Sequence, residues 1–387
     1  MKWMVRKSFD EVVLFARTGL NPRQNFKLGN GNNKYITIKN IHNNEIVIDA
    51  NTDVVDDEAI ALIHKRSQIK KGDILFCSIG RLGDMYIIQD EPEGWDINES
   101  VFAFTVDTNI VRQKYFYYVF KNRDTIEYLS KNSSGSTFKS IKMNQLKKME
   151  FNLPSLEEQD QIVEVLDKTS KVIEYRQKEL SALDDLIKAR FVELFGDCDN
   201  MVPMNDLCSI ITDGTHQPPK FQESGIPFIF VSNLANNTVT YNAEKFISDE
   251  TYNELIKRTP IEIGDVLLST VGSYGHPAVV VEDRKFLFQR HIAYMKPRHE
   301  IINSFYLHGA LLAPDGQRQI EEKVKGIAQK TLNLSEIKKI MIPVPSLEQQ
   351  EEFEQFVKQV DKSKVEVQRA LDETQKLFDS LMQQYFG

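Results

Sequence analysis

Two stretches of the chain place mainly apolar residues at alternating steps of three and four, over about forty residues each. A pattern sustained over so many turns predicts a coiled-coil helix rather than an ordinary surface helix. We call these positions the seam. Its apolar members are Ile162, Leu166, Ile173, Leu180, Leu183, Ile187 and Leu194 in the first stretch and Phe353, Val357, Val360, Val367, Leu371, Phe378 and Leu381 in the second.

An exposed apolar seam of this length would drive aggregation, so we expect the two helices to pack on each other. A twofold relation between them predicts an antiparallel arrangement. Val163 and Val172 lie off the seam and widen the apolar stripe. These two residues therefore indicate a docking surface for another subunit.

The start of each helix belongs to a repeat about 191 residues long. The segment FNLPSLEEQ at 151–159 returns as IPVPSLEQQ at 342–350. Ser155 with Glu158, and Ser346 with Gln349, have the spacing of a capping box that begins a helix. Both helices end on Phe-Gly, at Phe195 and Phe386. A repeat this long indicates a duplicated domain plus helix, and so a molecule with pseudo-twofold symmetry.

The segments outside the helices also align with each other. Residues 71–83 match 263–275, and both predict a turn, a buried strand and a Gly-x-x-Gly loop. Residues 35–44 match 228–237, a strand ending in an Asn-containing turn. We also expect helices over 114–130 and 304–320. The predicted fold is α+β, with two mixed domains, 1–154 and 197–345, separated by long helices at 155–196 and 346–387.

The net charge of −8 comes from the two predicted helices. Residues 155–195 hold ten acidic and six basic residues, and 346–386 hold nine and five, so each helix carries −4. The rest of the chain is balanced, which leaves room for local basic faces, so the composition does not exclude a nucleic-acid partner. No apolar run reaches the roughly 18 residues of a membrane span, and the N-terminus lacks a signal-peptide pattern. The three cysteines show no paired spacing, so we expect a reduced, cytoplasmic protein.

Motifs for catalysis are absent from the sequence. It has neither a Gly-x-x-x-x-Gly-Lys-Ser/Thr phosphate loop nor the Asn/Asp-Pro-Pro-Tyr/Phe segment with which amino-methyltransferases hold a target base. Pro314-Asp315 and Glu321-Glu322-Lys323 resemble a nuclease motif, but their close spacing predicts one charged helix. The seven histidines form no HxH or HxxxH pair, so no metal site is expected. We expect a chain without catalysis, metal or cofactor of its own.

The double PSLEEQ and PSLEQQ motif, at 154–159 and 345–350, resembles the specificity subunit of type I restriction–modification enzymes. The Gly-Asp-x-Leu strands and the Asp-Gly-Thr-His segment at 213–216 are typical of that family, and the resemblance covers essentially the whole chain. The first domain departs from it, with Arg-Thr-Gly-Leu at 17–20 in place of Asp-Gly-Thr-His.

The resemblance implies a subunit that reads a bipartite asymmetric site in double-stranded DNA. It further implies docking of two methyltransferase subunits, which bind S-adenosylmethionine and methylate adenine. Two restriction–translocase subunits, which use ATP and Mg²⁺, join such complexes in restriction systems. No membrane partner is implied.

Base edges are read by polar and cationic side chains on loops, while phosphates are held by Lys, Arg and backbone amides. Two sets of loops offer such groups: the Gly-x-x-Gly loops and the Gly-rich turns before the long helices. Two further segments of the second domain, at 215–220 and 289–291, add to them. The candidate DNA contacts are Ser78, Arg81, Ser136, Thr137, Lys139 and Lys142 in the first domain and Thr215, His216, Gln217, Lys220, Thr270, Ser273, Tyr274, His276, Arg290, Gln329 and Lys330 in the second.

Two other interpretations remain open from the sequence. The polar loops can be ordinary turns in which glycine serves only backbone geometry. The whole chain can be a non-enzymatic adaptor, in which a coiled coil carries two domains that bind peptides or RNA. An active methyltransferase is disfavoured by the missing cofactor and target-base motifs.

Overall fold

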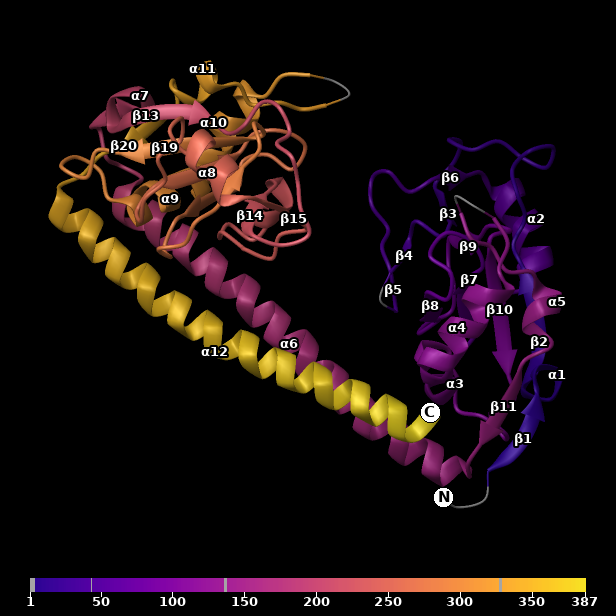
Figure 1. Ribbon diagram of the computed structural model, residues 1–387. Helices are drawn as coiled ribbons and strands as arrows, with labels where there is room; N and C mark the ends of the chain where they lie inside the picture. Colours follow the sequence, from indigo (N-terminus) through magenta and orange to yellow (C-terminus); the bar gives the residue numbers. More distant parts are fainter. Residues whose placement is uncertain (1–3, 43, 136–137, 327–328) are drawn as a thin grey trace. The chain divides into compact units, whose positions relative to one another are not determined.

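The computed structural model describes residues 4–42, 44–135, 138–326 and 329–387, and the chain divides into two compact units. The first unit holds Met1–Tyr175 and Leu371–Gly387, and the second holds Arg176–Ala370. Each unit therefore combines one domain with one half of each long helix. The mixed α and β fold predicted from the sequence is confirmed (Figure 1).

The first unit contains a four-stranded antiparallel sheet of order β2-β10-β7-β8, made of Val13–Thr18, Val101–Val106, Ile74–Cys77 and Met85–Ile87. A second sheet, β6-β3-β9, is made of Val54–Val55, Asn33–Ile36 and Trp95–Ile97, and its β3–β9 pair is parallel. The remaining short elements are β1 Val5–Ser8 paired with β11 Glu150–Leu153, β4 Ile41–His42 paired with β5 Glu45–Ile46, and helices α1 Phe9–Val12, α2 Asp57–Ser67 and α5 Met143–Leu146.

The second unit repeats this plan. Its four-stranded sheet has the order β13-β19-β16-β17, made of Cys208–Asp213, Ile292–Pro297, Val266–Ser269 and Pro277–Val279. Its three-stranded sheet, β15-β14-β18, is made of Lys245–Ile247, Ile226–Ile229 and Leu287–Phe288, again with one parallel pair. The other short elements are β12 Met201–Pro203 paired with β20 Met341–Pro343, α7 Met204–Leu207, the 3₁₀ turn η1 Val231–Leu234, α8 Asp249–Leu255 and α11 Leu334–Ile337.

The matched strands β7 and β16 are buried along their whole length. Continuous apolar runs of this kind fit a strand covered on both faces. In the first unit, Phe76 of β7 packs with Phe104 and Phe120 in the main core. The expected Asn-containing turns are present too, because Asn44 and Asn237 have φ of 64° and 57°, a conformation that Asn tolerates.

The two domain helices predicted over 114–130 and 304–320 are each broken in two. The first becomes α3 Gln113–Lys121 and α4 Arg123–Asn132, with Asn122 extended and capping α4 through a bond from the Thr125 amide. The second becomes α9 Ser304–Leu312 and α10 Pro314–Lys323. Pro314 forces the preceding residue out of the helical region, which breaks the helix there. The charged segment 314–323 is a helix, as predicted.

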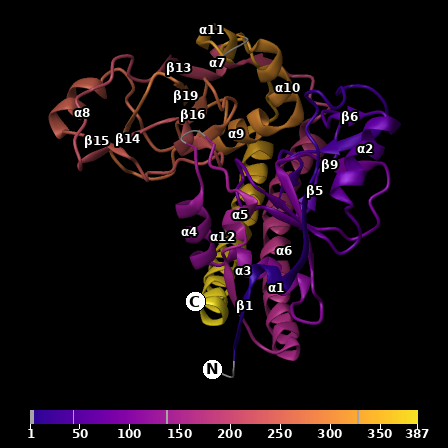
Figure 2. The same cartoon turned by 90° about the vertical axis from the view of Figure 1, so that its right-hand side faces the viewer.

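The long helices are α6 Leu156–Phe195 and α12 Leu347–Phe386, and they lie side by side in both views (Figures 1 and 2). In the second unit, Lys364 pairs with Asp184 at 2.6 Å. Farther along α6, Arg190 lies over the ring of Phe356, and then Phe195 contacts Phe353. Rising numbers in α6 thus meet falling numbers in α12, so the helices are antiparallel, as predicted.

Most of the predicted seam is buried or half-buried, and one position is wrong. Leu194 is 41% exposed, while Phe191 and Phe195 lie in the core of the second unit. The sequence interpretation carried the three-four spacing to the end of the helix. The structure shifts it by one residue there, because the two Phe rings pack around Tyr306 of α9.

The ring of Phe353 on α12 lies close against α9, where Gly309 leaves space for it. A Cβ added at Gly309 would come within 2.6 Å of this ring. At the equivalent places in the first unit stand Tyr118 on α3 and Ile162 on α6, both buried in its core. The large residue is therefore on the long helix in one unit and on the domain helix in the other.

A buried glutamine joins each domain to the start of its long helix. Gln159 accepts from the Arg112 amide at 2.8 Å and donates to the carbonyls of Ile110 and Pro154, both at 3.0 Å. Gln350 repeats this set with the Asn303 amide at 2.8 Å and the carbonyls of Ile301 and Pro345 at 3.1 and 3.0 Å.

We expect Gln350→Ala to lower the free energy of unfolding by about 2–4 kcal/mol, because it removes a fully buried side chain and leaves one backbone amide and two carbonyls without their partner at a part-buried place. Denaturant unfolding of the full-length chain measures this. Gln355→Ala, at an exposed position of the same helix, is the matched control and should change stability by less than about 0.5 kcal/mol. Equal effects of the two substitutions would contradict the anchoring role.

Candidate nucleic-acid interface

One end of each four-stranded sheet gathers most of the candidate loops. In the first unit, Thr18 at the end of β2 pairs with Phe102, and Val101 at the start of β10 pairs with Cys77 at the end of β7. In the second unit, Asp213 and Ser269 end strands β13 and β16 beside the start of β19 at Ile292. The Gly-x-x-Gly loops leave from these ends, so the register alone brings them beside the segment after β2 or β13. We call this the loop end of the sheet.

Each Gly-x-x-Gly loop needs glycine at both of its ends. Gly80 and Gly83 have φ of 70° and 89°, and Gly272 and Gly275 have φ of 73° and 82°. Side-chain-bearing residues rarely adopt this left-handed region. The two loops are therefore built on the same backbone path, with different residues between the glycines.

The Gly-rich turn before each long helix lies beside this loop. The Gly80 amide donates to the Lys139 carbonyl at 3.0 Å, and the Gly272 amide to the Lys330 carbonyl at 3.3 Å. The same hydrogen bond in both units fixes Lys139 and Lys330 as structural equivalents. Ser136 and Thr137, predicted as contacts in the first turn, lie outside the described residues.

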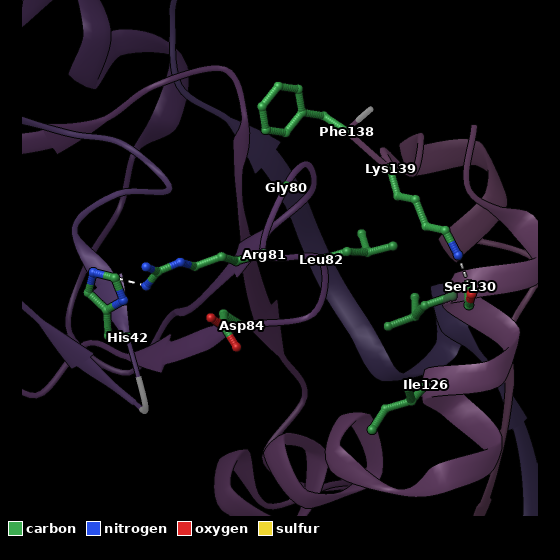
Figure 3. Close-up of a pocket in the computed structure, with 10 residues that line it drawn as sticks. His42, Gly80, Arg81, Leu82, Asp84, Ile126, Ser130, Phe138 and Lys139 are labelled. Atoms are coloured by element: carbon green, nitrogen blue, oxygen red, sulfur yellow. Dashed lines mark hydrogen bonds between the residues drawn. The ribbon is translucent and has the colours of Figure 1, made fainter. Parts of the chain in front are cut away.

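In the first unit, the loop and the turn enclose a groove of 630 Å³ with helix α4 (Figure 3). Arg81 and Leu82 leave the loop in opposite directions, and Arg81 reaches His42 at 3.0 Å. Lys139 bonds the hydroxyl of Ser130 on α4 at 2.7 Å. The groove is lined by His42, Gly80, Arg81, Leu82, Asp84, Ile126, Leu129, Ser130, Phe138 and Lys139.

In the second unit, three side chains bond across the corresponding place. Tyr274 donates to the carboxylate of Glu321 on α10, and Lys330 reaches that carboxylate at 2.7 Å and the Tyr274 hydroxyl at 3.1 Å. The hydrogen bond from Lys330 lowers the pKa of Glu321 below its ordinary value, with the Tyr274 bond as the next cause. The Glu321 hydrogen bond in turn raises the pKa of Lys330.

The Asp-Gly-Thr-His segment occupies the end of β13. The Asp213 carboxylate pairs with Arg258 and lies 2.9 Å from the His216 ring. A Cβ at Gly214 would collide with the Phe288 carbonyl, and one at Gly19 with the Ile97 carbonyl. The two glycines thus make the same close approach, which supports the alignment of Arg-Thr-Gly-Leu with Asp-Gly-Thr-His.

Sequence reasoning missed Arg258 and its equivalent Arg66. Arg66 donates to the hydroxyl of Thr18 at 3.3 Å, just as Arg258 bonds Asp213, so both arginines stand at the loop end. A signal was present, since Lys-Arg-Ser at 65–67 returns as Lys-Arg-Thr at 257–259.

Several predicted contacts are corrected by burial. Ser78 is 6% and Thr270 5% exposed, and the Ser78 hydroxyl donates to the Ser100 carbonyl at 2.8 Å, so neither side chain is free to reach DNA. His276 is half-buried, and its ring bonds the side-chain oxygen of Asn237 at 3.0 Å.

The other predicted contacts stay on the surface to a greater extent. Thr215 is half-buried, and its backbone bridges to Gln289. Among the described residues, the exposed candidates in the first unit are Arg81, Lys139 and Lys142, and those in the second are His216, Gln217, Lys220, Ser273, Arg290, Gln329 and Lys330.

Within the described ranges there is no group of three or more His, Cys, Asp or Glu side chains placed to hold a metal ion. The same residues include no helix that is both long and apolar enough to cross a bilayer. What the loop ends offer is polar and cationic side chains, the groups that contact phosphates and base edges.

The family model described as the type I restriction modification DNA specificity domain matches the chain twice, over residues 2–184 and 200–374. The EcoBI specificity subunit of Escherichia coli is 25% identical over 326 residues, covering 75% of this chain and 68% of that protein. The MjaIX specificity subunit of Methanocaldococcus jannaschii is 24% identical over 336 residues, covering 81% and 76%.

Two solved structures share the fold. One is a chain from a study of complex assembly and conformational transition of the type I R-M system, with a TM-score of 0.57, 17% identity and coverage of 100% of this chain and 98% of that one. The other is the type I restriction-modification S subunit from M. genitalium, with a TM-score of 0.52, 14% identity and coverage of 98% and 95%.

We expect Lys330→Met to raise the pKa of Glu321 toward the ordinary glutamate value, because the substitution removes the largest cause of its depression. A carboxylate whose pKa is lowered in the folded state contributes stability above its unfolded pKa, and loses it as pH falls through the folded value. Carbon-detected NMR titration of glutamate-labelled protein measures the shift. Tyr274→Phe should move the pKa in the same direction by less, and no change in either variant would contradict the bonded cluster.

Proposed function

The chain belongs to the family of type I restriction–modification DNA specificity proteins, and from this membership we propose how it reads DNA and assembles. It is a non-catalytic specificity subunit that recognises DNA within a type I restriction–modification complex. We propose that it reads a bipartite, asymmetric site in double-stranded DNA, one half by each domain. The cytoplasm, where its DNA is found, is the proposed location.

The observation that carries this proposal is the contrast at the two loop ends. The backbone path, the two glycines of the loop and the amide bond to the following turn are the same in both units. The side chains presented there differ, with Arg81 and Leu82 in one and Ser273 and Tyr274 in the other. The same backbone with different side chains in the two domains fits two half-sites of different sequence. A pair of peptide-binding domains on an adaptor finds no support in the family comparisons.

We further propose that two methyltransferase subunits, which bind S-adenosylmethionine, dock on the long helices. Restriction–translocase subunits that use ATP and Mg²⁺ would join them. Exposed apolar residues on the helices support the docking, since they include Val172 and Tyr175 on α6 and Val365 and Leu377 on α12. Val163, predicted for this surface, instead packs against the core of the first unit.

Methylome sequencing with and without the gene tests the central proposal. We expect one bipartite adenine-modified motif to disappear when the gene is deleted, and its two unequal parts to give the half-sites. Reintroducing the gene should restore the motif. The proposed function is contradicted if the parent strain expresses the whole complex and deletion of the gene leaves its methylome unchanged.

We expect Arg81→Ala to change recognition only in the half-site read by residues 1–154, and Tyr274→Ala only in the other. A lost base contact costs about 1–3 kcal/mol and relaxes one base position, because one set of donors is removed. Binding selection from randomised sites measures both halves at once. Lys168→Ala, on an exposed side chain of α6, is the control. Altered preference in both halves from one substitution would contradict the modular assignment.

We expect Val172→Asp to weaken co-purification of the methyltransferase subunit at least tenfold while leaving the thermal unfolding midpoint unchanged, because this side chain is 40% exposed. Val163→Asp should instead destabilise the chain, since it places a charge against the core. Pull-down and thermal unfolding on the same samples separate the two effects. If assembly survives Val172→Asp undiminished, the docking surface lies elsewhere.

A further inference from the structure

The groove of the first unit and its counterpart in the second are the same place built with different chemistry. Gly83 lies against Leu129 of α4, and Gly275 against Ile320 of α10, with the nearest carbons 3.2 and 3.3 Å from an added Cβ. Ile79 and Val271 bridge to Ser140 and Thr331 in the same way. These matching contacts establish which residue of the first site is structurally equivalent to which residue of the second.

Tyr274 and Glu321 close this place in the second unit. Their bond spans from the loop to α10, and the ammonium of Lys330 lies 5.6 Å from the centre of the Tyr274 ring. Lys330 is therefore engaged by an anion and by an aromatic ring of its own domain. Its charge is already offset, and moving it to a phosphate would break both contacts.

Leu82 and Ser130 leave the corresponding place open in the first unit, because they stand where the second unit has Tyr274 and Glu321. Among the described residues, Lys139 bonds the neutral hydroxyl of Ser130 and no carboxylate, so its charge is not offset there. Arg81, at the position of Ser273, adds a second cation across the groove (Figure 3). The acidic lining residue, Asp84, pairs with Lys121 of α3 at 3.4 Å.

Phe138 stands at the rim of the open groove, next to Lys139. Its side chain is 66% exposed, the highest value among the large hydrophobic residues that the structure describes, whereas Gln329 occupies the equivalent place in the second unit. An exposed aromatic ring between cations suits a ligand that combines an anionic backbone with flat faces. Single-stranded or distorted nucleic acid has this chemistry, and protein aromatic rings stack on its bases.

We propose that the groove of residues 80–82, 126–130 and 138–139 holds the DNA backbone of one half-site, with Lys139 on its phosphates, Arg81 toward a base edge and Phe138 against an adjoining base or sugar. The equivalent place in the second unit does not hold a phosphate, and Lys330 there is a structural cation. This rests on the proposed function. The new element is that the two domains hold their half-sites differently. The first uses positive charge in an open groove, and the second uses a surface that its own side chains close.

The salt dependence of DNA binding separates the two lysines. Each phosphate contact contributes about 0.9 to the slope of log affinity against log salt concentration. With the full-length chain in its methyltransferase complex, we expect Lys139→Met to lower that slope by about 0.9. The double variant Glu321→Gln/Lys330→Met removes an ion pair without changing net charge, and should leave the slope unchanged. A slope reduced by the double variant but not by Lys139→Met would overturn the assignment.

Exchange of the two closing residues is the stronger test. Leu82→Tyr/Ser130→Glu transplants the closed arrangement into the first unit, where it should fill the groove and neutralise Lys139. We expect binding to the first half-site to fall at least tenfold, with the salt slope reduced as in Lys139→Met. Leu82→Phe/Ser130→Ala, which adds a ring without the carboxylate, should retain the slope. Thermal unfolding shows whether both variants are folded. Unchanged DNA binding by a folded Leu82→Tyr/Ser130→Glu variant would contradict the proposal.

Phe138→Ala provides an independent readout. With 2-aminopurine at successive positions of the first half-site, the wild-type complex should raise fluorescence at one position where Phe138 disturbs stacking, and Phe138→Ala should abolish that signal. Loss of methyltransferase co-purification, with the salt slope intact, would instead make the groove a protein-docking surface and overturn the inference. Absence of any site-specific binding by the wild-type complex would count against the proposed function itself.

Discussion

The architecture depends on a single buried side chain at the start of each long helix. Gln159 and Gln350 use both ends of their amide, accepting one backbone N–H and donating to two carbonyls. Two of these groups in each set belong to the loop before a domain helix, and the third precedes the long helix itself. A buried amide group with every partner in place is rigid, because any rotation strands polar atoms away from water. The direction in which each helix leaves its domain is therefore fixed by hydrogen-bond geometry.

This anchoring explains why the domains can differ without disturbing the scaffold. The anchored motif, the sheet order and the glycine positions recur in both units. The variable residues stand between the glycines and on the facing helix, at the loop end of the sheet. Changes there alter what the surface presents while the buried glutamine and the core remain as they are. The division between a constant frame and a changeable surface suits the two different half-sites proposed for the two domains.

Features governed by repetition and periodicity could be predicted from the sequence. The duplicated motif gave the two-domain plan and the antiparallel helices, since both follow from counting and spacing. Details set by three-dimensional packing could not. Leu194 kept the apolar spacing but lost its place to Phe195, because the choice depends on rings from α9. Ser78 looked like a surface hydroxyl because it follows the buried strand and begins the Gly-x-x-Gly loop, and the sequence does not show that it is buried there and bonds the Ser100 carbonyl. The bond from Tyr274 to Glu321 joins residues 47 apart, beyond the reach of any local pattern.

The large residue lies on the domain helix in the first unit and on the long helix in the second, and this difference determines which domain fits which long helix. Gly309 with Phe353 and Tyr118 with Ile162 divide the available volume in opposite ways. A domain carrying Tyr118 would collide with Phe353 if it were seated on the other helix, and the reverse exchange would leave a void beside Ile162. Each domain therefore packs well only on its own long helix. A molecule built from a duplication can in this way keep a defined polarity, and the packing of its core would then set the order of the two proposed half-sites along DNA.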